Sequence, residues 1–587
     1  MDYELKPSKE NTKTLAAAQE SVLPLLRDEK KSLAIALVCV LISSAANLLS
    51  PVIIAKVIDT AIASRDFAAV LHYAALLLAV YVVGVVAQYV QTIRMGTVGR
   101  GVLFKLRAEL FEKLASLPIA FFNQNRAGDL ISRINNDTDK LNQFFSQALM
   151  QFFGNFFVIL GAGILLLSLN FKLGLVALVP ALCVFVITRF ASGWVKRTSR
   201  AGLESLGSMS GEIQESLANF KVIVAFNRVD YFRQKFGEAN AQNYAASVRS
   251  DIASGIFTPL YTLASSAAQL AVLGFGIWLA LHGSLSIGLL VGYLLYVNSF
   301  YTPLRQLASV WSSFQLALAS LDRIRDVLAM RSNLPILAAG KDAASAAKGT
   351  FLSFDDVSFE YPGGKQVLHD VNVSLERGKT YALVGPTGGG KTTTASLMAR
   401  LYDPTDGTVY LDGRDIRTYS DEERSKKIGF ILQEPFLFTG TIKDNIAYGN
   451  PELRDLSDED FMQMLKASNL HRLMERFSEG LGTTTRASGD TLSLGQKQLI
   501  AFMRAVLRKP ELLILDEATA NIDTVTEELL EEILDSLPKE TTRVIIAHRL
   551  NTIANADDIF FVNGGTLTEA GSLEHAVEML LHGKRQS

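Results

Sequence analysis

Two short stretches of this 587-residue chain carry residues suited to holding phosphate and a divalent metal ion. The first is "GPTGGGKTT" (385–393), which follows the apolar run "TYALV" and precedes "TASLMARLY". Glycines let backbone amides curl around a phosphate, while a lysine and a threonine hydroxyl suit further phosphate oxygens and Mg²⁺. This strand–loop–helix pattern predicts a phosphate-binding loop, with Lys391 on the β- and γ-oxygens and Thr392 on the metal.

The second stretch is "LLILDE" (512–517), four apolar residues followed by two carboxylates. A buried strand of this kind delivers its last residues to the carboxyl edge of an open α/β sheet, where ligands bind. Asp516 is therefore predicted to hold Mg²⁺ through water, and Glu517 to act as the general base that polarises an attacking water. Two carboxylates at an ordinary strand end are the weaker explanation, because a phosphate loop lies in the same chain.

A third stretch, "GDTLSLGQKQLIAFMRAV" (489–506), places the small polar turn Ser493 to Gln496 directly before an apolar helix. The first amides of a helix have no partners inside it, and its dipole favours negative charge there. The turn is therefore a second candidate site for an anion.

The composition points to a membrane protein of two or more domains. Nearly half of the residues are apolar (49%), the mean hydropathy is positive, and the net charge of -2 with no basic tract argues against a nucleic-acid partner. The two cysteines, Cys39 and Cys183, lie in apolar runs and are expected to be buried and unpaired. The polar N-terminus has no apolar segment typical of a cleaved signal peptide.

The first 310 residues contain long runs without Lys, Arg, Asp or Glu. Because about 20 apolar residues cross a bilayer, these runs predict six membrane helices. Buried helices of a large soluble core would not account for so many uncharged runs. The predicted spans are 32–60, 67–93, 142–168, 172–194, 252–282 and 284–310.

The charges on the connections predict the orientation. The loops 94–140 and 189–250 hold eight and nine Lys or Arg, whereas the three opposite turns hold only Arg65 and Lys172. Basic loops stay in the cytoplasm, so both termini are predicted to be cytoplasmic. Helical periodicity in both loops indicates membrane helices that continue into the cytosol, with a short crossing helix at each tip. Ahead of the first span, "LAAAQESVLPLLRDEK" is either an amphipathic surface helix or an ordinary tail.

The second half has the texture of a soluble α/β domain. Short apolar strands ("TYALVG", "LLILDE", "RVIIAH", "IFFVNGG") predict a parallel sheet, and the alternation in "FLSFDDVSFEY" and "QVLHDVNVSLE" predicts an antiparallel sheet beside it. The expected organisation is an N-terminal segment (1–31), a six-helix transmembrane domain (32–330), a small-residue linker (331–349) and a nucleotide-binding domain (350–587). The fold class is a membrane α-helical bundle with long cytosolic extensions, followed by an α/β P-loop ATPase domain.

The ordered motifs resemble those of an ABC transporter half of the exporter type, over roughly residues 15 to 580. "LSLGQ" is similar to the family signature LSGGQ, "FEYP" to its aromatic motif, "ILQEP" to its glutamine loop, "ANID" to its D-loop and "IIAHRL" to its switch histidine. The resemblance implies an ATP-driven multi-pass membrane transporter, in a bacterial cytoplasmic membrane, that uses ATP and Mg²⁺.

The resemblance also assigns roles to single residues. Tyr361 would stack on adenine, Gln433 would reach Mg²⁺ and the attacking water, Asp523 would end the D-loop, and His548 would be the switch histidine. The ATP-binding set is Tyr361, Gly385, Pro386, Thr387, Gly388, Gly389, Gly390, Lys391, Thr392 and Thr393; the catalytic set is Glu517, His548 and Gln433; the metal set is Thr392, Gln433 and Asp516.

In this family the signature turn caps ATP bound to the facing domain, so Ser493, Leu494, Gly495 and Gln496 would contact the partner's nucleotide. The resemblance therefore implies a second half-transporter as partner, either an identical chain or a different one. Leu494 stands where the family has Gly, and Ala487 stands at an expected Glu that contacts the partner's coupling helices. Such departures occur in heterodimeric members, which leaves homodimer and heterodimer nearly even, with a small lean to the heterodimer. The tips of the two cytosolic loops, 117–130 and 218–227, resemble coupling helices.

The membrane spans hold almost no ionisable side chains away from their ends, which disfavours an ion or a strongly charged solute as cargo. An apolar or amphiphilic drug, lipid or hydrophobic peptide is compatible with the aromatic residues in the spans, although most of these are better explained by packing. A regulatory subunit, or an importer built on the same fold, is the alternative. The aromatic residues are Phe152, Phe153, Phe156, Phe157, Tyr293, Tyr296 and Tyr301.

Overall fold

The computed structural model describes residues 3–5, 28–332, 334–338, 350–485, 492–516, 522–546, 553 and 555–582. The chain forms two compact units, which are described separately. One, the membrane unit, comprises 6–114 and 128–329; the other, the nucleotide unit, comprises 1–5, 115–127 and 330–587. Residues 15–27 of the surface helix considered above and most of the predicted linker lie outside the described residues.

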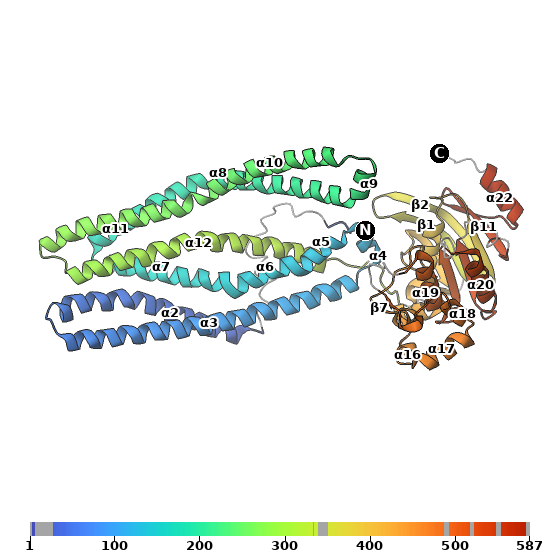
Figure 1. The fold of residues 1–587 in the computed structure, drawn as a ribbon, viewed down its shortest axis with the longest axis horizontal. Coiled ribbons are helices and arrows are strands. Elements are labelled where there is room, and N and C mark those ends of the chain that lie inside the picture. The colour runs from blue at the N-terminus through green and yellow to red at the C-terminus, as the bar shows by residue number, and fades with distance from the viewer. Residues whose placement is uncertain are drawn as a thin grey trace. The chain divides into compact units, whose positions relative to one another are not determined.

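The membrane unit consists of helices, and six of them are long and apolar enough to cross a bilayer, as predicted (Figure 1). A chain in hydrocarbon must satisfy its backbone hydrogen bonds internally, which explains the uninterrupted helices. Three short π-helical segments lie within two of these helices. The elements are α2 (Lys30–Lys56), η1 (Val57–Ile62), α3 (Phe67–Ala115), α5 (Ala127–Ser132), η2 (Arg133–Asp137), α6 (Thr138–Gln143), η3 (Phe144–Ala148), α7 (Leu149–Leu169), α8 (Phe171–Ala218), α9 (Phe220–Ala225), α10 (Val229–Gly255), α11 (Phe257–Leu281) and α12 (Ile287–Leu328).

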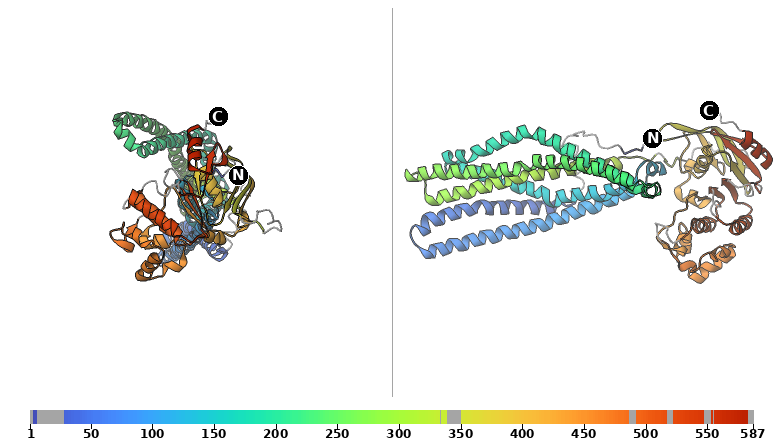
Figure 2. Two further views of the ribbon diagram at one scale, coloured as in Figure 1. Left: turned by 90° about the vertical axis from the view of Figure 1, so that its right-hand side faces the viewer. Right: turned by 45° about the horizontal axis from the view of Figure 1, so that its top comes forward.

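Several membrane helices extend far beyond the length that a bilayer requires. Helices α3 and α8 have 49 and 48 residues, so each is about 70 Å long at the rise of an α-helix. The hydrocarbon core is only about 30 Å thick, so these helices continue well outside it. The right-hand view of Figure 2 shows long helices running alongside one another. The short helix α9 at the tip of the second loop confirms that prediction.

Helix α12 is the hub of the membrane unit, because it packs against α2, α7 and α11. Three of its tyrosines, each at most 2% exposed, donate hydroxyl hydrogen bonds to main-chain carbonyls of three other helices. Tyr293 reaches Leu166 in α7 at 2.8 Å, Tyr296 reaches Leu48 in α2, and Tyr301 reaches Ala177 in α8 at 2.9 Å. These aromatic residues therefore pack between helices.

A partly buried ionic cluster joins the C-terminal part of α12 to the helices that follow the first loop tip. The Arg323 guanidinium lies 2.8 Å from Asp129 and 3.2 Å from Asp137, and Asp129 also pairs with Arg133 at 2.9 Å. Ser320 adds a hydrogen bond of 3.1 Å to Asp137. Asp137 is 0% exposed, and Arg133 is 4% exposed. We refer to these residues as the ionic junction.

The expectation that both cysteines are buried is wrong for Cys183. Both thiols are free, but Cys183 is exposed on α8, and Cys39 is partly buried. An apolar run in a membrane helix contacts either protein or lipid, and hydropathy does not distinguish the two.

The nucleotide unit combines two larger sheets with helices. The antiparallel sheet has the order β2-β1-β4-β5, and the six-stranded sheet has the order β12-β11-β3-β10-β9-β6, parallel except for β12. Both predicted sheets are thus confirmed. The strands are β1 (Thr350–Tyr361), β2 (Lys365–Glu376), β3 (Thr380–Val384), β4 (Asp406–Leu411), β5 (Arg414–Asp415), β6 (Ile428–Ile431), β7 (Gly440–Thr441), β8 (Thr484–Thr485), β9 (Leu512–Asp516), β10 (Thr542–Ile546), β11 (Asp558–Asn563) and β12 (Thr566–Glu569).

Strand β3 is buried on both faces, which fits its continuous apolar sequence. Tyr381 and Leu383 enter a core shared with the antiparallel sheet, while Ala382 and Val384 enter a second core lined by helices. The helices of this unit are α4 (Ile119–Gln124), α13 (Lys391–Met398), α14 (Asp421–Lys427), α15 (Ile442–Ala447), α16 (Pro451–Arg454), α17 (Asp458–Ala467), α18 (His471–Met474), α19 (Leu494–Val506), α20 (Thr524–Asp535) and α22 (Leu573–His582).

The short helix α4, from the tip of the first long loop, belongs to the nucleotide unit. Its Asn123 amide donates to the hydroxyl of Tyr402 at 2.8 Å. The segment at residues 3–5 holds the other side of α4: the Tyr3 ring contacts Phe121 edge-on, and the Tyr3 amide donates to Gln124 at 2.7 Å. The predicted coupling helix is thus packed into the domain that carries the phosphate loop.

We expect Asp137→Ala to destabilise the protein by about 2 kcal/mol, because Arg323 loses a buried carboxylate partner and keeps only the partly exposed Asp129. In nanodiscs the thermal unfolding midpoint should fall by about 4 °C. Asp139→Ala is the matched control: Asp139 is 51% exposed and pairs with Arg107 at the surface, so it should cost about 0.5 kcal/mol. Equal midpoints for the two variants would contradict a stabilising role for the junction.

Candidate nucleotide site

The phosphate loop joins β3 to α13 in a conformation that requires glycine. Gly385 has φ of 148° and Gly390, the residue before α13, has φ of 116°. A Cβ on Gly385 would lie 2.0 Å from the carbonyl oxygen of Val562, and one on Gly390 would lie 2.8 Å from the side chain of Leu368. A larger residue at either position would therefore displace the loop from the neighbouring strands.

Lys391 opens α13 and folds back over the loop that precedes it. Its ammonium donates to the carbonyl oxygens of Gly385 at 2.8 Å and Pro386 at 3.0 Å, and the residue is 6% exposed. Thr392 beside it is the exposed residue of a helix in which Lys391 and residues 393 to 398 are buried. The threonine hydroxyl is therefore open to a ligand at the start of the helix.

Tyr361, the expected adenine-stacking residue, lies next to this helix. Its hydroxyl is 3.0 Å from the Thr393 hydroxyl, and its ring meets that of Tyr402 edge-on at 5.3 Å. Burial raises the pKa of the Tyr402 hydroxyl, so it stays protonated and accepts the hydrogen bond from Asn123. A continuous chain of contacts thus runs from α4 through two tyrosine rings to the phosphate loop.

Asp516 lies at the carboxyl edge of the parallel sheet. Strand β10 separates β9 from β3, with Ile546 paired to Asp516 on one side and to Leu383 on the other. The strand ends at Asp516 and Val384 therefore share one edge. Asp516 is 2% exposed, and Gln433 follows the neighbouring strand β6 and is exposed.

The oxygen-bearing side chains at this edge are suitable ligands for Mg²⁺. This hard cation takes oxygen ligands and binds through one or two carboxylates plus substrate phosphates. A hydroxyl (Thr392), a carboxylate (Asp516) and an amide oxygen (Gln433) are of that kind. Among the described residues, no group of three His, Cys, Asp or Glu side chains is gathered to hold a metal unaided. Glu517 and His548, which follow β9 and β10 in the chain, lie outside the described residues, as does Ala487.

The signature turn forms the exposed N-terminus of α19. The Ser493 hydroxyl accepts from the Gln496 amide at 3.2 Å, and the Gln496 side-chain oxygen accepts from the Ser493 amide at 3.0 Å. This reciprocal capping box fixes the start of the helix. Leu494 is 43% exposed, so the side chain that replaces the family glycine projects outward.

Arg476 connects the signature turn to the D-loop aspartate. The side-chain amide of Gln496 donates to the Arg476 carbonyl at 2.9 Å. The Arg476 guanidinium lies 3.7 Å from Asp523. Asp523 caps α20, and hydrogen bonds from the Thr526 hydroxyl and amide hold the pKa of its carboxyl below the usual range. Asp523 is consequently ionised at neutral pH. The sequence analysis did not single out Arg476.

Two further polar residues hold the signature helix and were also missed. Arg504 of α19 donates to the carbonyl of Asn445 at 2.8 Å and to that of Phe436 at 3.2 Å. Asn445, 1% exposed, donates to the Phe438 carbonyl at 2.9 Å. Burial lowers the pKa of the Arg504 guanidinium. These contacts tie α19 to the segment after Gln433, and only the polarity of residues within an apolar helix could have indicated them.

Comparison with known families decides the identity of this arrangement. Residues 33–304 match the ABC transporter transmembrane region, and residues 368–520 match the ABC transporter family of ATP-binding domains. An uncharacterized ABC transporter ATP-binding protein of Bacillus subtilis (strain 168), YfiC, is 34% identical over 579 residues, covering 97% of this chain and 94% of that protein. The chain belongs to the ABC transporter family. It is of the exporter type, with membrane and ATP-binding regions fused, as the motifs predicted.

Two other similar proteins extend the comparison. A fatty acid ABC transporter ATP-binding/permease protein of Mycobacterium bovis (strain ATCC BAA-935 / AF2122/97) is 31% identical over 507 residues, covering 86% of this chain and 79% of that protein. The solved structure of a bacterial Atm1-family ABC exporter with ATP bound matches with a TM-score of 0.77 at 24% identity. It covers 95% of this chain and 99% of that one, which supports the same fold.

We predict that Gly390→Ala weakens ATP binding by this ABC transporter by at least about tenfold, since the loop pays both a left-handed backbone penalty and a clash with Leu368. Equilibrium binding of a fluorescent ATP analogue to the purified chain would measure it. Gly482→Ala is the control, because a Cβ there meets nothing within 4 Å and the backbone is not left-handed. Unchanged affinity in Gly390→Ala would mean that the loop holds nucleotide in another conformation.

Proposed function

We propose that the protein is an ATP-driven half-transporter that works as a dimer and moves an apolar or amphiphilic substrate across the membrane. The observation that carries this proposal is the exposed N-terminus of α19. The capping box leaves the Ser493 hydroxyl proton and first-turn amides available to an anion, and Ser493 itself is exposed. Each chain then supplies one phosphate loop and one signature turn, and two chains complete two composite ATP sites.

A second exposed surface supports a partner. Helix α9 carries Phe220, Val222 and Val224, and Phe226 follows it; these residues are 53%, 55%, 53% and 75% exposed. This tip lies beyond the predicted membrane spans, and so many apolar side chains on a short cytosolic helix favour a protein contact. We assign it as the second coupling helix, which docks on the partner's nucleotide domain.

The chemistry at each composite site follows from the residues of this chain. The loop amides and Lys391 bind the phosphates, while Thr392 and Asp516 hold Mg²⁺, which neutralises charge on the phosphate oxygens. Glu517 polarises the attacking water and accepts its proton. The partner's Ser493 turn supplies donors to the γ-phosphate.

Closure of the two nucleotide domains would reach the membrane helices through two sets of contacts. In the nucleotide unit, the path Thr393–Tyr361–Tyr402–Asn123 joins the phosphate loop to α4. In the membrane unit, the ionic junction joins α5 and η2, which follow α4 in the chain, to α12. A buried ion-pair cluster favours one geometry, so it transmits displacement better than an apolar contact that can slide.

The proposed cargo is a drug, lipid or hydrophobic peptide. The membrane spans carry few ionisable groups, and the relative from Mycobacterium bovis is named as a fatty acid transporter. The basic loops place both termini and the ATPase domain in the cytoplasm of a bacterium, with the bundle in its cytoplasmic membrane.

A regulatory role in a heterodimer is the second candidate, and Leu494 is the observation that favours it. A leucine in the signature turn adds bulk at the point of contact with the partner's nucleotide. A different chain with an intact signature would then complete the ATP site that contains Lys391. The signature turn of this chain would complete the other ATP site, which would hydrolyse ATP more slowly.

A complementation experiment tests the composite sites. Glu517→Gln and Ser493→Ala should each abolish ATP hydrolysis in homodimers, because both sites of each dimer are defective. When the two variants are co-expressed with different tags, the mixed dimer contains one site with a normal Glu517 and a normal partner Ser493. We expect about half of the wild-type activity in doubly purified mixed dimers.

Silent mixed dimers alongside active wild-type dimers would contradict the composite arrangement. A wild-type chain that binds ATP but hydrolyses almost none would favour the heterodimer. Ser493→Thr separates capping from catalysis, since threonine preserves an N-cap hydroxyl and should cost little helix stability.

We expect Tyr402→Phe to weaken coupling while leaving ATP hydrolysis within about twofold, because it removes the acceptor for Asn123 and keeps the ring against Tyr361. In a Cys39→Ser background, the rate of N-ethylmaleimide labelling of Cys183 reports on the membrane helices. Vanadate trapping with ATP should change this rate in the parent chain, and Tyr402→Phe should reduce that change by about half or more. Tyr410→Phe, elsewhere in the nucleotide unit, serves as the control and should leave the change intact.

A further inference from the structure

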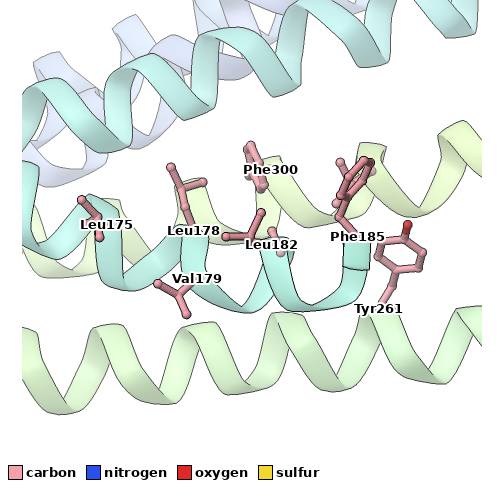
Figure 3. A pocket seen from close by; sticks show the side chains of 9 residues that line it. Leu175, Leu178, Val179, Leu182, Phe185, Tyr261 and Phe300 are labelled. Carbon is pink, nitrogen blue, oxygen red and sulfur yellow. The ribbon is translucent and has the colours of Figure 1, made fainter. Parts of the chain in front are cut away.

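An apolar groove of about 460 Å³ lies among α8, α11 and α12 within the membrane unit (Figure 3). Its volume falls within the range of roughly 300 to 1,000 Å³ that small-molecule sites occupy. Leu182 and Phe185 line it yet stay 64% and 68% exposed, so the groove is open along one side. The lining residues are Leu175, Leu178, Val179, Ala181, Leu182, Phe185, Tyr261, Phe300 and Leu304.

The groove is long and narrow. Its α8 lining runs from Leu175 to Phe185, which spans about 15 Å along the helix. Each of the two flanking helices contains a proline beside the groove, Pro180 in α8 and Pro303 in α12. Each proline removes one backbone hydrogen bond and allows the helix to bend. The bond from Tyr301 to the Ala177 carbonyl holds α12 and α8 together at this level.

Two arginines continue these helix faces beyond the groove. On α8, Leu178, Leu182 and Phe185 follow a helical stripe, and Arg189 is the next residue on it, four positions after Phe185. On α12, Arg305 lies four positions after Tyr301 and so shares the face that contacts α8. Both arginines are exposed.

Each arginine lies just beyond the last lining residue of its helix. Arg305 directly follows Leu304, and Arg189 comes four residues after Phe185. Both helices run in the same direction across the bilayer, so the two arginines lie toward the same end of the groove.

Within the described part of the chain, neither side chain forms an ion pair or donates a hydrogen bond. The nearby helices also offer no carboxylate, because the sequence contains no Asp or Glu between Phe171 and Leu203 or between Ile252 and Leu321. A cation near hydrocarbon is stabilised by an anion that it can pair with. The anion at this place must come from outside the three helices.

We propose that this groove binds a single-chain amphiphile with an anionic headgroup, its chain along the α8 stripe and its headgroup between Arg189 and Arg305. This proposal deepens the proposed transport function and rests on it. The open groove suits one flexible chain, the two positive charges disfavour a cationic drug, and the lining offers a peptide backbone a single side-chain hydroxyl, that of Tyr261. A carboxylate also matches the fork of a guanidinium.

Binding of radiolabelled oleate to the full chain tests the proposal, in nanodiscs of zwitterionic phosphatidylcholine, without nucleotide and at mildly alkaline pH. Oleyl alcohol has the same chain without the charge and serves as the paired probe. We expect oleate to bind at least about tenfold more tightly than oleyl alcohol. Arg189→Gln and Arg305→Gln should each weaken oleate binding by about tenfold, and should leave oleyl alcohol within about twofold.

Two further variants complete the design. Ala181→Phe fills the groove and should weaken both probes, whereas Lys172→Gln, at the opposite end of α8, should change neither. Equal affinity for the two probes, or arginine variants that bind oleate like the wild type, would overturn the proposal. ATP hydrolysis is measured on the same samples. Protein that hydrolyses ATP but does not bind oleate would contradict only this inference. Protein that binds oleate but does not hydrolyse ATP would contradict only the proposed function.

Discussion

The main constraint on this molecule is that a backbone in hydrocarbon must satisfy its own hydrogen bonds. The membrane unit meets it with helices, and α3 and α8 continue for about 70 Å, far past the hydrocarbon. A continuous helix resists compression along its axis, so a displacement at the end that lies outside the hydrocarbon also moves the membrane segment. The same requirement for internal hydrogen bonds thus also produces the long helices, or rods, on which ATP-driven motion depends.

Several polar side chains of the membrane unit hold helices in fixed relative positions. The three tyrosine hydroxyls of α12 donate to carbonyls of α2, α7 and α8, so this one helix is tied to three others. Outside the predicted spans, the ionic junction holds the C-terminal part of the same helix. Apolar packing alone would permit the helices to slide past one another by small steps. A hydrogen bond or ion pair between specific groups opposes such sliding.

Local patterns sufficed to predict the elements of the fold. Runs without charge gave the six spans, and the apolar stretch ending at Asp516 gave a strand and its edge. Contacts between distant positions were beyond such patterns: Asn123 and Tyr402 are 279 residues apart, and nothing near either residue announces the other. Arg476 and Asn445 look like ordinary helix-end and helix residues until folding buries or pairs them. Cys183 was misjudged because an apolar neighbourhood does not say whether lipid or protein fills it.

The position of Lys391 bears on how the site can release its product. Its ammonium already donates to two carbonyl oxygens of its own loop, so a nucleotide phosphate that binds Lys391, as we propose, competes with these oxygens. This competition lowers the affinity for ATP, but it also gives the lysine a resting place when phosphate leaves. The buried charge is never left without acceptors, and the loop keeps its shape between turnovers. After each cycle Lys391 returns to the carbonyl oxygens of its own loop, so the loop need not refold around the next nucleotide.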